Sequence, residues 1–213
     1  VGRYVKIIDE KGVVEGVCSF IDTMMYVICC LQVNQEQVYS SYKKLYAYQF
    51  QAIMTLNEIL VSCLSGIWFG KVDDWAVYID SALPNELRNI NQDVSTEEMY
   101  YLYEDLTYVL SYSIIRGYKV GIGIPLNTVL KDMNTYMLGL WVSAEHDFGQ
   151  AMNLWSFNSF KHNLESSLSS VTGYFLVSVF LSNIHSHFYC NETCDWFHCD
   201  PPLLSQCLLL YIS

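Results

Sequence analysis

The longest periodic stretch of the chain, residues 34–69, places apolar side chains at intervals of three and four residues. This spacing puts them on one face of an α-helix, which has to be buried against the rest of the fold. Glycines at positions 66 and 70 are typical of the end of such a helix. The apolar stripe consists of Tyr42, Leu45, Tyr46, Phe50, Ile53, Leu56, Ile59, Leu60, Cys63 and Leu64. The pattern therefore predicts one long buried helix here.

Similar spacing predicts helices along most of the remaining chain. Residues 13–31 repeat apolar side chains at helical intervals. Asp73 and Asp74 are suited to cap a short helix that Pro84 ends, and the polar residues 85–93 are expected to form a loop. Further helices are predicted at residues 95–116, 127–145, 150–168 and 171–187.

Strands are suggested only at residues 1–11, which end in a turn-like Asp-Glu-Lys-Gly run, and at the glycine-rich residues 117–125. The chain has 213 residues, of which 52% are hydrophobic, which is enough apolar material for one domain. The predicted fold class is mainly α: a single-domain bundle of six to eight helices, with a short N-terminal strand or hairpin. Residues 189–213, rich in Cys and His, are expected to pack on this bundle as an extension.

Negative charge is concentrated in one segment. Between Asp73 and Asp105 the chain carries nine carboxylates and a single basic residue, Arg88, against a formal net charge of −11 for the whole chain. Such a field acts on solubility and on the choice of partner. A basic protein is therefore the partner predicted. Direct binding of nucleic acid is disfavoured, because the eleven Lys and Arg residues are scattered rather than clustered.

The helix predicted at residues 95–116 would present part of this negative charge on one of its faces. Ser95 and Glu98 form a capping-box pattern at its start, and the side opposite its apolar stripe combines carboxylates with tyrosines. No Lys or Arg balances these carboxylates before Arg116. The alternative is an ordinary solvated acidic face. The predicted partner-binding residues are Asp73, Asp74, Glu97, Tyr101, Glu104, Asp105, Tyr108 and Tyr112.

The C-terminal residues contain the sharpest candidate for a metal site. Imidazole and thiolate are the ligands that zinc selects, and His187, Cys190, Cys194 and His198 are spaced by three, four and four residues. On one continuous helix these four would span about 16 Å, too far for a single tetrahedral zinc site unless the helix is broken. A zinc site, a local disulfide and a reduced structural cluster are all compatible with the spacing. No cofactor is expected, and zinc is the one that this cluster would suit.

Two other patterns carry weaker signals. Glu145, His146 and Asp147 resemble an acid–base group, but no nucleophile accompanies them and Gly149 suggests a helix end, so an enzyme is not expected. The apolar runs 13–33 and 166–189 approach the length of a membrane span. Carboxylates in the first run and serines in the second favour buried helices instead. With no signal peptide in view, a cytoplasmic location is expected.

The leading hypothesis for function is an acidic protein-binding inhibitor that occludes a basic partner, for example one acting on nucleic acid. Immunity proteins, antitoxins and phage-encoded blockers of defence enzymes share this profile as classes. Two alternatives are a metal-dependent enzyme that uses the C-terminal His/Cys cluster and a membrane-associated or structural subunit.

Overall fold

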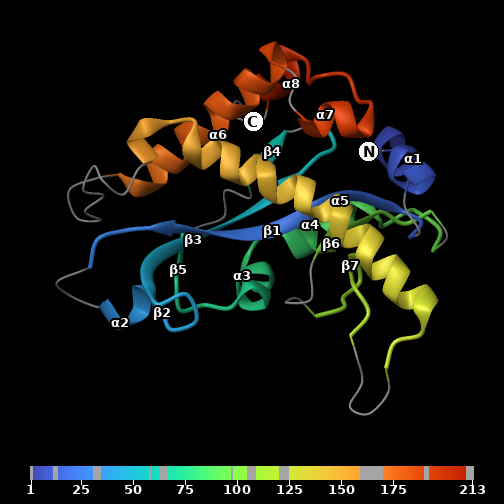
Figure 1. The fold of residues 1–213 in the computed structure, drawn as a ribbon, viewed down its shortest axis with the longest axis horizontal. Helices are drawn as coiled ribbons and strands as arrows, with labels where there is room; N and C mark the ends of the chain where they lie inside the picture. The colour runs from blue at the N-terminus through green and yellow to red at the C-terminus, as the bar shows by residue number, and fades with distance from the viewer. Residues whose placement is uncertain are drawn as a thin grey trace.

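The structure, a computed structural model, describes residues 2–11, 14–30, 35–57, 59–62, 67–96, 98–104, 109–119, 125–158, 170–189 and 192–209. Within these ranges a mixed sheet of seven strands curls into a half-barrel, and helices cover both of its faces (Figure 1). The predicted mainly α bundle is therefore wrong.

The strands are β1 (Val17–Val27), β2 (Tyr39–Ser40), β3 (Leu45–Met54), β4 (Leu60–Ser62), β5 (Trp68–Phe69), β6 (Tyr101–Glu104) and β7 (Ile114–Arg116). The helices are α1 (Gly2–Lys11), α2 (Gln35–Val38), α3 (Asp74–Asp80), α4 (Leu83–Ile90), α5 (Thr128–Asn153), α6 (Val171–Phe188), α7 (Glu192–Phe197) and α8 (Leu204–Leu209). A short 3-10 turn, Ser156–Asn158, follows α5.

Strand β3 is the centre of the sheet. Along one edge it pairs antiparallel with β1, from Met54 opposite Phe20 to Ala47 opposite Val27. Along the other edge it pairs in turn with β2, β5 and β4. Strands β6 and β7 extend the sheet beyond β1 and run parallel to it. All the other strands are therefore attached to this antiparallel pair, β7 through β6.

Alternation along β1 sends side chains into two cores. Phe20 and Tyr26 belong to a large core between the sheet and the helices α1, α5, α6 and α7. In that core the ring of Phe50 in β3 stacks on Phe175 of α6, with 4.0 Å between the ring centroids. Ile21 faces the other way, into a smaller core under α3 and α4, and Cys18 joins that core at a register shift between Val17 and Ser19. Both faces of β1 are therefore buried from Val17 to Ile21.

This double burial explains why the helices predicted at residues 13–31 and 34–69 are wrong. A strand that is covered on both faces reads as a nearly continuous apolar run, which periodicity cannot distinguish from a buried helix. The abundance of aromatic and β-branched residues in β1 and β3 is the property that favours a strand.

Three further expectations are corrected. The described residues within 95–116 include β6 and β7 instead of a helix, and the amide of Glu98 donates to the carbonyl of Ser95 in a turn (2.9 Å). Residues 2–11 form α1 and not a strand, and α4 occupies much of the predicted loop 85–93.

The helix starts were predicted more accurately than the strands. Asp73 caps α3 by accepting from the amide of Ala76 (2.8 Å), and Asn127 caps α5 by accepting from Leu130 (2.8 Å). Helix α6 matches its predicted range. Helix α5 continues past Gly149 to Asn153, so the end predicted near residue 145 is wrong. The helix expected at 150–168 falls partly in α5 and largely outside the described residues.

None of the helices in the described ranges combines the length and the apolar content that a bilayer crossing needs. Of the two apolar runs, the first contains β1, and much of the second forms α6, which buries Phe175 and Val179 in the large core.

Three asparagine side chains each form two hydrogen bonds with the backbone N–H and C=O groups of one residue, as a neighbouring strand would. The amide of Asn183 in α6, which is fully buried, accepts from the N–H of Leu60 in β4 (2.9 Å) and donates to its carbonyl (3.0 Å). Asn91 forms the same two bonds with the backbone of Tyr100, and Asn134 forms them with Tyr118. Each amide thus satisfies both backbone groups of one residue, and at Leu60 these groups are buried away from water.

Replacing Asn183 by Ala should lower the free energy of unfolding by about 2 to 4 kcal/mol, because it leaves two buried backbone groups of Leu60 unsatisfied. Urea titration monitored by circular dichroism measures this. The matched control is Asn153→Ala, an exposed asparagine at the end of α5, which should change stability by less than about 0.5 kcal/mol. Equal effects of both substitutions would contradict the role assigned to Asn183.

Burial also controls the ionisation of Cys18. Its thiol donates to the carbonyl of Tyr101 (3.3 Å), and burial raises its pKa from 9.0 to about 11. The folded chain therefore holds this proton at pH values where the unfolded chain has lost it. The resulting stabilisation is complete below pH 9 and is lost as pH rises towards 11.

The free energy of unfolding should accordingly fall by about 2 to 3 kcal/mol between pH 9 and 11 through Cys18 alone, at about 1.4 kcal/mol per pH unit. Cys18→Ala should make this part of the pH profile less steep, whereas Cys29→Ala, at a partly exposed cysteine, should leave the wild-type slope. A profile that Cys18→Ala does not alter would show that other groups, such as Tyr26, determine the alkaline limit.

Candidate functional site

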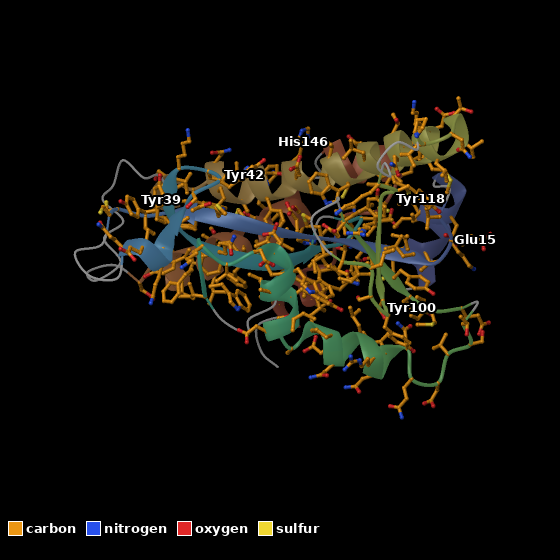
Figure 2. All side chains as sticks on the ribbon, turned by 90° about the horizontal axis from the view of Figure 1, so that it is seen from below. Glu15, Tyr39, Tyr42, Tyr100, Tyr118 and His146 are labelled. Atoms are coloured by element: carbon orange, nitrogen blue, oxygen red, sulfur yellow. The ribbon has the colours of Figure 1, made fainter. Side chains whose placement is uncertain are left out.

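A groove of about 850 Å³ opens beside β1, between α5 and the turn that joins β2 to β3. Residues 22–25 and Val27 of β1 contribute to its lining, together with Trp141, Glu145 and Phe148 of α5. Figure 2 shows α5 along the upper margin of the view, with Tyr42 and His146 labelled near it, and the helices α3 and α4 along the lower margin.

The charged side chains of the groove are predominantly acidic. Asp22, Asp74 and Glu145 line it together with one cation, Lys43, which gives a net charge of −2 (three carboxylates against one ammonium). The Asp22 carboxylate accepts from the amide of Thr23 (2.7 Å). The Lys43 ammonium lies 5.4 Å from the centre of the exposed Tyr42 ring, within cation–π range. A cationic ligand therefore fits the groove better than an anionic one.

The α5 wall of the groove is apolar. Trp141 and Phe148 are both largely buried, and Met152 continues the wall one turn later. The indole N–H of Trp141 is shielded from solvent and has no hydrogen-bond partner in the part of the chain that the structure describes. Because an indole N–H can only donate, a carbonyl or carboxylate is the type of group that would satisfy it.

The acidic segment predicted from the sequence lies mainly on α3, α4 and the turn after them. Its described, exposed carboxylates are Asp73, Asp80, Glu86, Asp93 and Glu98. Three of these carboxylates accept a hydrogen bond: that of Asp73 caps α3, that of Asp80 accepts from the indole of Trp68 (2.9 Å), and that of Glu98 accepts from the Ser95 hydroxyl (3.2 Å). Arg88, the single cation of the segment, contacts the side-chain oxygen of Asn85 (3.5 Å). Asp74, at the start of α3, also lines the groove, so the acidic surface and the groove adjoin.

The predicted partner-binding residues are not brought together on one helix face. Asp73 and Tyr112 are exposed, and Tyr101 is half-buried in β6. Glu104 is only 2% exposed, so the prediction that it lies on a solvent-facing surface is wrong. Glu97, Asp105 and Tyr108 lie outside the described residues.

Glu104 instead belongs to the interior of the sheet. It is the register partner of Arg116 in the parallel pair β6–β7, which places opposite charges on neighbouring strands. A buried carboxylate next to a cation is far less costly than an isolated one. This arrangement accounts for an acidic residue at a position with almost no solvent contact.

The predicted metal ligands do not share a helical face, because α6 ends at Phe188 and α7 starts at Glu192. The His187 ring nitrogen Nδ1 lies 2.7 Å from the carbonyl oxygen of Pro202, Cys194 is 1% exposed, and His198 is exposed with a left-handed backbone. Cys190 is outside the described residues. Among the residues that are described, no group of three potential ligands is placed to hold a metal.

No disulfide links any two of the described cysteines, which are Cys18, Cys29, Cys30, Cys194, Cys199 and Cys207. Glu145 and His146 are exposed in the interior of α5, away from the helix end that their sequence suggested, and the side chain of Asp147 is not described.

Several groove residues were missed in the sequence, among them Asp22, Lys43 and Trp141. A signal for Asp22 exists, because a carboxylate within an apolar strand requires a polar neighbour or access to solvent. The approach of the β2–β3 turn to α5 involves residues about 100 positions apart, which no local pattern contains. A comparison of the chain with protein-family models, curated proteins and solved structures found no match.

Replacing Glu104 by Lys should lower the free energy of unfolding by at least about 3 kcal/mol, because it places two like charges side by side in a buried position. Glu98→Lys, at an exposed carboxylate only six positions earlier, should change it by less than about 0.5 kcal/mol. Thermal and urea unfolding measure both. If Glu104→Lys folds as stably as the wild type, Glu104 is not the buried residue described above.

Proposed function

We propose that the chain is an acidic inhibitor that binds a basic protein and occludes its functional surface. The observation that supports this most is the exposed acidity of α3, α4 and the following turn, where five carboxylates face solvent and Arg88 is the single cation in the segment. No ion pair to these five carboxylates is found among the described residues. They are therefore available to cations of a partner.

The mechanism follows from charge and contact area. Opposite charges accelerate the encounter of two proteins and fix their relative orientation. On a partner that acts on nucleic acid, carboxylates would occupy positions that phosphates otherwise take. The exposed rings of Tyr42 and Tyr112 add contact area of the type that is enriched in interfaces. We place this activity in the cytoplasm, where thiols such as those of the described cysteines stay reduced.

The test is capture of a partner from an extract of the cells that produce the chain, with three baits. The first is the wild type, and the second carries Glu86→Lys, Asp93→Lys and Glu98→Lys. These three carboxylates neither cap a helix nor bind Trp68. The third bait is a control with the same change in net charge at exposed positions elsewhere: Glu36→Lys, Asp132→Lys and Asp195→Lys.

A basic protein should bind the wild type and the control at low salt, dissociate at high salt, and bind the first triple variant about 100-fold more weakly. All three baits should unfold at similar temperatures. The proposal fails if no basic protein is captured, or if the two triple variants capture it equally well.

A further inference from the structure

The edge of β1 that faces away from β3 is paired over less than half of its length within the described ranges. Strand β6 pairs with Val17, Ser19 and Phe20 only. From Ile21 to Val27, no strand in the described ranges lies against this edge, whereas β3 pairs with the opposite edge throughout. An unpaired strand edge presents backbone donors and acceptors that can bind another extended chain.

The backbone groups at this edge can be identified. The amide of Ile28, just beyond β1, donates to the carbonyl of Tyr46, its register partner on the β3 side (2.9 Å). Bonding alternates along an antiparallel pair, so the even-numbered residues of β1 turn their N–H and C=O groups towards β3. The groups of Thr23, Met25 and Val27 therefore point to the opposite, open edge. All three of these residues line the groove.

One of the three outward donors is already occupied. The amide of Thr23 donates to the Asp22 carboxylate (2.7 Å), close to the point where β6 ends. The N–H groups of Met25 and Val27, which point away from β3, are the two donors that remain at this edge inside the groove. They are spaced by two residues, about 7 Å, which matches the spacing of the acceptors on an added strand.

The groove selects the chemistry of such a strand. Its net charge of −2 favours cationic side chains, and the apolar wall of Trp141 and Phe148 favours apolar ones. Because successive side chains of a strand point to opposite faces, a segment that alternates basic and apolar residues satisfies both requirements. A second copy of this chain, with its net charge of −11, would add repulsion instead.

We propose that an extended, basic segment of the partner adds as a strand to the open edge of β1 at Thr23–Val27. In this mode of recognition backbone hydrogen bonds provide the affinity and side-chain pockets provide the specificity. The inference rests on the proposed function, since it assigns the segment to the same basic partner.

Two glycines of α5 provide a matched pair of variants. A Cβ atom added at Gly149, which lines the groove, meets no atom within 4 Å, and the same holds for Gly139, which is not among the groove residues. Leucine favours the helix at both positions. Gly149→Leu should therefore fill the groove without disturbing the fold, and Gly139→Leu should leave the groove open.

The probe is an acetylated and amidated peptide of about seven residues that alternates lysine and valine, titrated by fluorescence polarisation. The wild type and Gly139→Leu should bind it, and Gly149→Leu should bind at least about tenfold more weakly. Two N-methylated forms, one modified at the lysine amides and one at the valine amides, test the backbone directly. Since alternate amides of a strand face opposite edges, one form should bind like the parent peptide and the other at least about tenfold more weakly.

Any of three results would overturn the inference: no binding of the peptide, equal binding by Gly149→Leu and Gly139→Leu, or equal binding of the two methylated forms. A self-associated wild type that Gly149→Leu dissociates would do so too, since the groove would then hold a second copy. In these cases the proposed function stands if the wild type captures a basic protein and the variant with lysine at positions 86, 93 and 98 does not. The proposed function itself fails if the wild type captures no basic protein.

Discussion

The antiparallel pairing of β1 with β3 is the interaction on which the rest of the structure depends. It is continuous over eight register partners, and β2, β4, β5 and β6 each add to one of these two strands. Because β1 has apolar side chains on both faces, it needs a helical layer on each side. The layer of α3 and α4, with the turn that follows it, also bears the exposed carboxylates of the acidic segment.

Hydrogen bonds from asparagine side chains hold the peripheral pieces to this centre. Strands β4, β6 and β7 are short, and short strands gain little from their own pairing. Asn183 fixes β4 to α6, Asn91 holds the residue before β6, and Asn134 holds the segment after β7. An amide that satisfies both backbone groups of one residue occupies the place that a neighbouring strand would take there. The open part of the β1 edge has no such amide at Met25 or Val27 among the described residues.

The sequence predicts the local signals of this fold well and its class poorly. Asp73, Asn127 and the range of α6 follow from capping chemistry and apolar content, which act within a few residues. The strands β1 and β3 were mistaken for helices because burial on both faces removes the alternation that identifies a strand. The acidity was located correctly, but its surface was assigned to a helix at residues 95–116 that does not form, so Glu104 was placed in solvent. The groove could not be predicted, since it joins β1, the β2–β3 turn, α3 and α5, and only the folded sheet brings these together.

Hydrogen exchange of the chain, measured by mass spectrometry with and without the captured basic partner, tests the central claim most directly. The partner should slow amide exchange at two places: the peptides that contain Met25 and Val27, and those that cover α4 and residues 91–98. Exchange in α6, on the opposite side of the large core from α3 and α4, should not change. Slower exchange confined to α6 or the C-terminal helices, with β1 and α4 unaffected, would contradict the account.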